Sequence, residues 1–135
     1  MNKVLCIDDD VITLMLCKTT IRKAEFSKEI ITAYNGQEAI EYYDTLAQNI
    51  QNSDNQSYPQ IIFLDLNMPV LGGWEFLDDF MNLFYTKFTE TKVVILSSSV
   101  DPKDRERAEK YPIVIDFCSK PITKEMLNNI KNKLS

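Results

Sequence analysis

The chain has 135 residues, of which 44% are hydrophobic and 26% charged, and its formal net charge is -5. This length and composition suit one folded domain and exclude a chain that is disordered throughout. The acidic charge argues against a nucleic-acid surface, and the absence of histidine excludes Ser-His-Asp catalysis and His-ligated zinc sites.

The sequence favours a cytoplasmic protein without membrane association. Its apolar runs are only a few residues long, whereas a membrane-spanning helix needs roughly 20. The N-terminal segment reaches Asp8 before the apolar core of a signal peptide could form. The cysteines, Cys6, Cys17 and Cys118, have no CxxC spacing, so we expect reduced thiols, mostly within the core.

Short apolar segments alternate with amphipathic segments along the chain. The expected strands cover residues 4–7, 29–34, 61–64, 93–96 and 113–117. The expected helices cover residues 11–26, 74–85, 102–110, 123–134, and one that opens at the Asn35-Gly36 turn and runs through Leu46. Strands that are apolar on both faces indicate a parallel sheet covered by helices, hence a doubly wound α/β fold. The polar residues 51–58 are expected to form an exposed connection.

Polar side chains follow several expected strands at their carboxyl ends. In chain order, these are Asp8-Asp9-Asp10, Asp65, Ser97-Ser98-Ser99 and Ser119-Lys120-Pro121. Each alone has an ordinary structural explanation, such as an Asp or Ser that caps a helix or a solvated Lys. Ligands of open parallel sheets, however, bind beyond the carboxyl ends of the strands. Four polar segments at that one edge therefore favour a functional site.

The chemistry of these side chains indicates a hard divalent cation. Crowded carboxylates repel one another unless a cation lies between them. Mg²⁺ suits this set because it takes oxygen ligands and completes its shell with water or phosphate oxygens. The sequence lacks the regularly spaced loop of an EF-hand calcium site. A lysine opposite the carboxylates could neutralise a phosphoryl group, with a carboxylate as the nucleophile.

Four ordered motifs carry a family resemblance. They are Val4-Leu5-Cys6-Ile7-Asp8-Asp9, Phe63-Leu64-Asp65-Leu66-Asn67-Met68-Pro69 with Gly73, Ser97, and Lys120-Pro121. Together they resemble the receiver domain of two-component response regulators over essentially the whole chain. The resemblance implies a CheY-like, flavodoxin-like sheet of five parallel strands in the order 2-1-3-4-5, with helices on both faces. We expect one receiver domain over residues 1–135 and no output domain, since 14 residues follow Pro121.

The resemblance also implies a phosphoacceptor and a metal. Asp65 would attack the phosphorus of a phosphohistidine on a histidine kinase or a histidine phosphotransfer protein. Mg²⁺ would be bound directly by Asp9, through water by Asp8 and through the backbone carbonyl of Asn67, with Asp65 as a further ligand. Asp10 fits a helix cap better than a metal ligand.

Two further side chains would complete the catalytic group. By resemblance, Ser97 would donate a hydrogen bond to a phosphoryl oxygen. Lys120 would pair first with Asp65 and then with the phosphate. Together with Asp65, these residues would let the domain catalyse its own phosphorylation and dephosphorylation without being an enzyme in the usual sense.

Signal output is expected on the face built from the fourth helix, the fifth strand and the fifth helix. By resemblance, Phe117 would be a switch residue that follows Ser97, and a core aromatic is the alternative interpretation. A downstream effector protein would bind this face. Tyr111-Pro112 departs from the Gly-Ala turn that is common in the family, so it either tailors partner choice or is a stiff turn. Gly72 stands where Asp or Asn is common.

The expected function is a phosphorylation-dependent signalling switch, and the sequence favours it over three alternatives. A haloacid-dehalogenase-like phosphatase needs a second Asp two residues after the nucleophile, where Asn67 cannot carry a proton. A flavodoxin-like flavin binder would place a phosphate against the acidic run at Asp8. An adaptor that keeps the fold without being phosphorylated is disfavoured by the presence of all five key side chains, Asp8, Asp9, Asp65, Ser97 and Lys120.

Overall fold

The computed structural model describes residues 2–49, 58–68, 70–98 and 101–134. Within them, the strands are β1 (Lys3–Ile7), β2 (Glu29–Ala33), β3 (Ile61–Leu64), β4 (Lys92–Ser97) and β5 (Val114–Ser119). The helices are α1 (Val11–Lys23), α2 (Gly36–Asn49), α3 (Gly73–Leu83), α4 (Pro102–Ala108) and α5 (Lys124–Leu134). The strands form one parallel sheet in the order β2-β1-β3-β4-β5, which confirms the predicted fold class.

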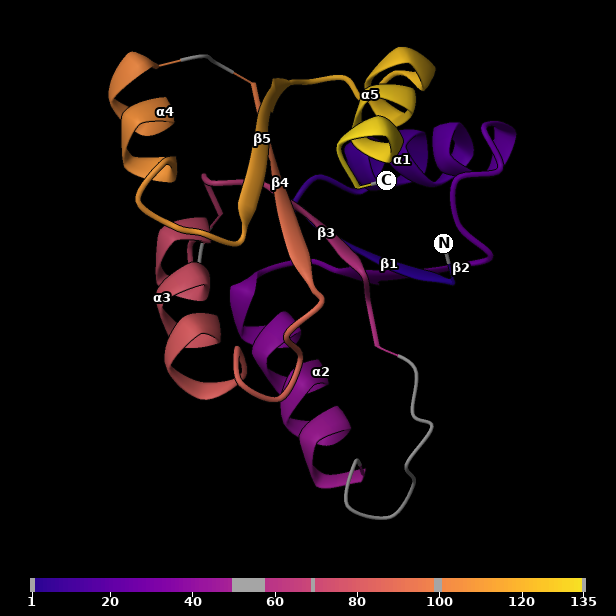
Figure 1. Cartoon of the computed structure of the whole chain (residues 1–135). Helices are drawn as coiled ribbons and strands as arrows, with labels where there is room; N and C mark the ends of the chain where they lie inside the picture. The colour runs from indigo at the N-terminus through magenta and orange to yellow at the C-terminus, as the bar shows by residue number, and fades with distance from the viewer. Residues whose placement is uncertain (1, 50–57, 69, 99–100, 135) are drawn as a thin grey trace.

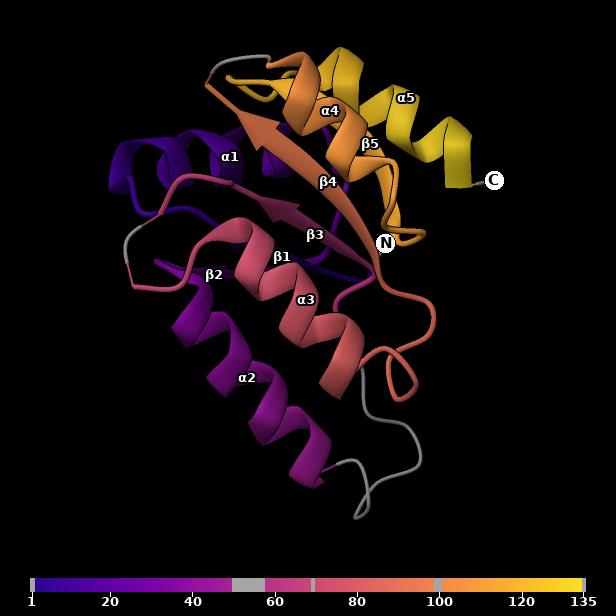
Figure 2. The same cartoon turned by 90° about the vertical axis from the view of Figure 1, so that its left-hand side faces the viewer.

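The sheet lies between two layers of helices. Figure 1 shows α1 and α5 on one face, and Figure 2 shows α2, α3 and α4 in front of the other. Successive strand residues point to opposite faces of the sheet, so the strands contribute side chains to a hydrophobic core on each face. The core under α2, α3 and α4 takes Leu5, Ile7, Ile62 and Leu64. The core under α1 and α5 takes Val4, Cys6, Ile61 and Phe63.

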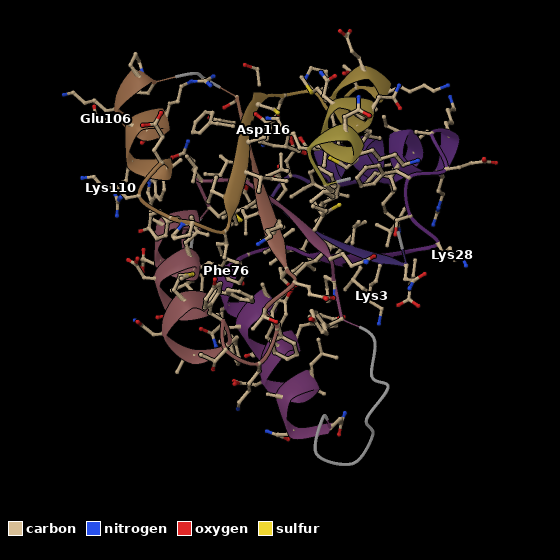
Figure 3. All side chains as sticks on the ribbon, viewed as in Figure 1. Lys3, Lys28, Phe76, Glu106, Lys110 and Asp116 are labelled. Carbon is tan, nitrogen blue, oxygen red and sulfur yellow. The ribbon has the colours of Figure 1, made fainter. Side chains whose placement is uncertain are left out.

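Aromatic side chains fill the larger core. Phe76 of α3 is fully buried and points toward the sheet (Figure 3). The ring of Tyr43 on α2 lies 5.0 Å, centroid to centroid, from Phe80 and 5.2 Å from Phe88. Tyr58 extends this cluster, 5.0 Å from Phe88. This residue was expected in an exposed connection, but its ring finds apolar partners; the rest of that connection, 51–57, lies outside the described residues.

The predicted helix over 11–26 is too long, because α1 ends at Lys23. Glu25 adopts a left-handed backbone conformation with φ 51°, and the Phe26 N–H donates to the carbonyl of Ile21 at 3.1 Å. This reversal buries the Phe26 ring completely. Burying that ring therefore overrides the helical periodicity of the sequence.

The predicted strand over 113–117 begins and ends too early. Ile113 precedes β5, although its carbonyl accepts a hydrogen bond from the Val93 N–H at 2.8 Å. The pairing of β4 with β5 is irregular between Val93 and Val94, so Asp116 lies opposite Val94. Regular pairing then continues to Ser119, which lies opposite Ser97. An irregularity of this kind depends on the partner strand and leaves no signal in the strand's own sequence.

The other boundaries agree with the predicted ones to within three residues, and β3 has the predicted bounds. The helices expected over 74–85 and 102–110 become α3, ending at Leu83, and α4, ending at Ala108, and α2 extends to Asn49. Single hydrogen-bonded turns follow both ends: the Phe84 N–H donates to Phe80 and the Glu109 N–H to Arg105. Such ends differ because the last turn of a helix frays.

The cysteines are free thiols. Cys6 and Cys17 are buried, whereas Cys118 is half-buried, and burial raises the pKa of its thiol to about 11. Among the described helices, none has the length and apolar character required to cross a bilayer.

Candidate functional site

Two acidic residues continue neighbouring strands at the carboxyl edge of the sheet. The Asp8 N–H donates to the carbonyl of Ala33 at 3.1 Å, and the Asp65 N–H donates to the carbonyl of Ile7 at 3.0 Å. These bonds extend the sheet pairing by one residue beyond β1 and β3. Both aspartates are only 5% exposed. The backbone therefore holds two nearly buried carboxylates side by side.

A third carboxylate joins them. Asp8, Asp9 and Asp65 each offer a carboxylate oxygen, and these oxygens lie within 4.8 Å of one another. Asp9 is exposed, so the group opens to water on that side. A set of oxygen donors that is partly solvated fits the preference of Mg²⁺. The structure thus brings together three of the four predicted metal ligands.

The fourth predicted ligand, Asn67, lies beside the group through its backbone. Its N–H is 3.4 Å from Oδ1 of Asp65, in the turn that follows β3. Its side chain is exposed. This contact helps to orient the Asp65 carboxylate. Metal binding by the Asn67 carbonyl stays a prediction.

Asp10 caps α1 and does not join the acidic group. Its Oδ1 accepts a hydrogen bond from the Ile12 N–H at 2.9 Å, and this bond holds the pKa of the Asp10 carboxyl below its usual value. The Asp10 N–H donates in turn to Oδ1 of Asp8 at 2.9 Å. The predicted cap is confirmed, and it also fixes the Asp8 carboxylate.

Lys120 reaches the buried carboxylates from the end of β5. Its Nζ lies 2.6 Å from Oδ2 of Asp8 and 3.5 Å from Oδ1 of Asp65. Its own N–H donates to the carbonyl of Ser97 at 2.8 Å, and the Lys120-Pro121 peptide bond is cis. The expected pair of Lys120 with Asp65 is therefore present, and the shorter contact with Asp8 is one that the sequence did not predict.

The electrostatics of the site follow from burial and from these pairs. Burial raises the pKa of Asp65 above its ordinary value, the charge of Asp8 adds to this, and Lys120 opposes it. Burial works against the charge of Lys120, but the hydrogen bond to Asp8 and the charge of Asp65 outweigh it and raise the Lys120 pKa. Lys120 is therefore a cation at neutral pH and partly balances the carboxylates.

Ser97 and Phe117 come from the last two strands of the sheet. Ser97 ends β4, is 1% exposed and lies opposite Ser119 of β5. Phe117 is buried opposite Ile95, and the Arg105 guanidinium lies 5.2 Å from the centroid of its ring. Phe117 is thus a core aromatic in this structure, and its part as a switch stays a prediction. Pro69 and Ser99 of the quoted segments lie outside the described residues.

One surface beside the site was not anticipated from the sequence. Four apolar residues in the first half of α1 are largely exposed: Val11 (56%), Ile12 (68%), Met15 (62%) and Leu16 (52%). Only Leu14, Cys17 and Ile21 of this helix are buried. The signal was present, because α1 holds more apolar residues than one face can bury. We call these four residues the α1 apolar surface.

Comparison with known proteins gives the class that the fold and the acidic site define. The chain matches the response regulator receiver domain over residues 4–131, so it belongs to this family. It is 37% identical to a two-component response regulator from Cytophaga hutchinsonii, with a TM-score of 0.85 and coverage of 99% of this chain and 96% of that one.

Two more distant relatives are informative. One is the response regulator TrrA from Thermotoga maritima, whose structure was solved in complex with Mg²⁺ and BeF. It is 21% identical to this chain with a TM-score of 0.72, and the match covers 100% of both chains. A protein-glutamate methylesterase/protein-glutamine glutaminase from Methanococcoides burtonii is 27% identical over 135 residues. The match covers 99% of this chain but only 34% of that relative, so the chain spans about a third of its length.

Proposed function

We propose that this receiver domain is a phosphorylation-dependent signalling switch in which Asp65 accepts a phosphoryl group with Mg²⁺ beside it. The observation that carries the proposal is the buried Asp65 carboxylate, grouped with those of Asp8 and Asp9 and 3.5 Å from the Lys120 ammonium. A nucleophile, a cation site and a fixed positive charge are the parts that phosphoryl transfer needs.

The donor is a phosphohistidine on a histidine kinase or a histidine phosphotransfer protein. This chain has no histidine, so the phosphohistidine belongs to a partner. The α1 apolar surface begins directly after Asp10 and offers a protein, rather than a small molecule, a place to bind beside Asp65.

In the transfer step, a carboxylate oxygen of Asp65 forms a bond to phosphorus as the phosphorus–nitrogen bond of the phosphohistidine breaks. The leaving imidazole keeps the electron pair and takes up a proton, and Asp65 becomes an acyl phosphate. Mg²⁺, when held by Asp8, Asp9 and Asp65, would supply charge neutralisation for the phosphoryl oxygens. Lys120 balances the added negative charge, and Ser97 donates a hydrogen bond to a phosphoryl oxygen.

The output face of the switch consists of α4, β5 and α5, and a downstream effector binds there. The new hydrogen bond draws Ser97 toward the phosphoryl group, and Phe117 follows by repacking between α4 and β5. A small repacking is sufficient, because a preference of about 1.4 kcal/mol for one state gives a partner tenfold selectivity.

The test is to incubate the protein with acetyl phosphate and Mg²⁺ and to measure its intact mass. We expect the mass of one added phosphoryl group. This adduct should not form when the metal is chelated before acetyl phosphate is added. Asp65→Asn should give no adduct, whereas the matched exposed variant Asp44→Asn should give the wild-type amount. An undiminished adduct in Asp65→Asn would refute the assignment, and no adduct in the wild type would favour an adaptor that is not phosphorylated.

A further inference from the structure

Tyr111 joins three elements of the fold. Its N–H donates to the carbonyl of Ala108 at 3.0 Å, and its carbonyl accepts from the Val114 N–H at 3.0 Å, so its backbone links the end of α4 to the start of β5. Its ring stacks on Trp74 of α3, with centroids 5.7 Å apart and planes inclined by 24°. Its hydroxyl donates to Oδ1 of Asp78 at 2.7 Å.

Trp74 and Asp78 are neighbours on one face of α3, since they are four residues apart. Tyr111 therefore lies along the first turns of this helix and contacts it at both its ring and its hydroxyl. Burial, together with the hydrogen bond to Asp78, raises the pKa of the Tyr111 phenol, so it remains a donor. The stack is polar at one end and apolar at the other.

Arg107 of α4 also contacts the Trp74 ring. Its guanidinium lies 4.5 Å from the centroid of the Trp74 ring, a cation–π distance. We call Trp74, Asp78, Arg107 and Tyr111 the α3–α4 clamp. It joins two helices that are neighbours in Figure 2.

The position of α4 depends on such contacts because the helix buries little. It has seven residues, and the only one that is buried is Ala108. Glu106, and Lys110 just after the helix, point outward into solvent (Figure 3). Burial of apolar area, which usually holds a helix in place, is therefore small here. The two arginines of α4 reach aromatic rings on either side, Arg107 on Trp74 and Arg105 on Phe117.

The other end of the clamp is attached to the phosphoacceptor. Gly73, next to Trp74, donates its N–H to the carbonyl of Leu66 at 3.1 Å. It packs so closely that a Cβ there would lie 2.7 Å from the carbonyl oxygen of Asp65. The first turn of α3 thus rests on the backbone of Asp65 and cannot stay in place if that backbone shifts.

We propose that the α3–α4 clamp couples the Asp65 segment to the output face, with Trp74 and Tyr111 as positioning residues that set where α4 lies. This inference rests on the proposed function. A shift of the Asp65 backbone moves the first turn of α3 and, through Trp74 and Tyr111, the end of α4. This route is separate from the one through Ser97 and Phe117, and the two meet on α4.

The test compares Tyr111→Leu, which removes the ring stack and the hydrogen bond, with Tyr111→Phe, which keeps the ring. Amide spectra are recorded with and without Mg²⁺ and beryllofluoride. In the wild type, we expect shifts in residues 65–67 and in α4. In Tyr111→Leu, the shifts in α4 should fall by at least half while those in 65–67 persist, and Tyr111→Phe should restore most of the α4 response.

Two controls keep the result specific. Tyr85→Leu makes the same change at a half-buried site near the far end of α3 and should leave the α4 response intact. Trp74 is the only tryptophan of the chain, so its fluorescence reports the clamp directly. Its emission should change with beryllofluoride in the wild type and change much less in Tyr111→Leu.

The outcomes separate the two proposals. A full α4 response in Tyr111→Leu would overturn the clamp alone. Absence of any shift in residues 65–67 of the wild type would overturn the proposed function and the clamp with it. If Tyr111→Leu does not fold, Arg107→Gln and Asp78→Leu change exposed positions of the same clamp, and a full α4 response in both would overturn the inference.

Discussion

Lys120 lies closer to Asp8 than to Asp65, with Nζ 2.6 Å from Oδ2 of Asp8 and 3.5 Å from Oδ1 of Asp65. Asp8 is also fixed by the Asp10 N–H at 2.9 Å. The lysine is therefore held mainly by Asp8 and less closely by Asp65, the proposed phosphoacceptor. Asp65 keeps a nearby positive charge without being locked to it, which suits a nucleophile.

Removal of the lysine charge should destabilise the resting protein. In Lys120→Met, two nearly buried carboxylates lose their cation, and we expect a loss of about 3 kcal/mol in the free energy of unfolding. Urea unfolding without metal measures this, and added Mg²⁺ should recover part of the loss. The control is Lys133→Met, which breaks the more exposed pair with Asp116 at 3.1 Å and should cost less than about 1 kcal/mol. Equal losses would show that the Lys120 pairs contribute no more than a surface pair.

Replacement of Asp65, the proposed phosphoacceptor, should make the free energy of unfolding less sensitive to pH. Burial and the charge of Asp8 raise the pKa of Asp65 in the folded state. Folding thus favours the protonated form, a contribution to stability that is fully present below the ordinary carboxyl pKa of 3.8 and is lost as the pH rises through the pKa of the folded state. Asp65→Asn should consequently be more stable than the wild type at pH 7.

The difference in unfolding free energy between the two proteins should shrink as the pH is lowered toward 3.8. Urea unfolding over this range measures it, with Asp44→Asn as the exposed control. A difference that stays constant with pH would mean that the Asp65 carboxyl gains nothing from protonation in the folded protein.

The variants Asp9→Ala and Asp10→Ala should distinguish metal binding from helix capping. Asp9→Ala removes one of three carboxylates within 4.8 Å of one another, so Mg²⁺ should raise the melting temperature much less than in the wild type. Without metal, its stability should hold or rise as a repelling charge is lost. Asp10→Ala should lose stability with the α1 cap and keep the full effect of Mg²⁺. Equal Mg²⁺ stabilisation of Asp9→Ala and the wild type would exclude Asp9 as a ligand.

The turn before α3 should tolerate a methyl group at one glycine and not at the next. A Cβ on Gly73 would lie 2.7 Å from both the Asp65 oxygen and the Leu66 Cα, which are backbone atoms. We expect Gly73→Ala to lower the free energy of unfolding by about 2 kcal/mol and to reduce phosphorylation of Asp65. Gly72→Ala, whose nearest contact would be 3.6 Å, should behave like the wild type. A stable Gly73→Ala would show that the turn adjusts freely.

The fold class and the edge that carries the acidic group were predictable from the sequence. Apolar runs such as Ile61–Leu64 are local signals, and parallel pairing brings the carboxyl ends of all strands to one edge. Asp65 and the run at Asp8 each follow such a strand directly, so their place needed no knowledge of packing. The cap at Asp10 is equally local, because the hydrogen bond spans two residues.

The irregular features required the tertiary structure. The end of α1 depends on where Phe26 finds its core, and the register of β5 depends on the partner strand β4. The exposure of Met15 depends on how many apolar residues of α1 the sheet can cover. The sequence shows that α1 holds more apolar residues than one face can bury, but the packing decides which of them are covered.

The sequence by itself determined which side chains lie at the edge of the sheet, since the strand ends follow from the local pattern and parallel strands place their carboxyl ends at one edge. Only the tertiary structure decided which of them pair. Lys120 is 112 positions from Asp8, and Tyr111 lies 37 positions from Trp74. Distances between such remote groups are set by the packing of the whole core, which allows few arrangements at its native density.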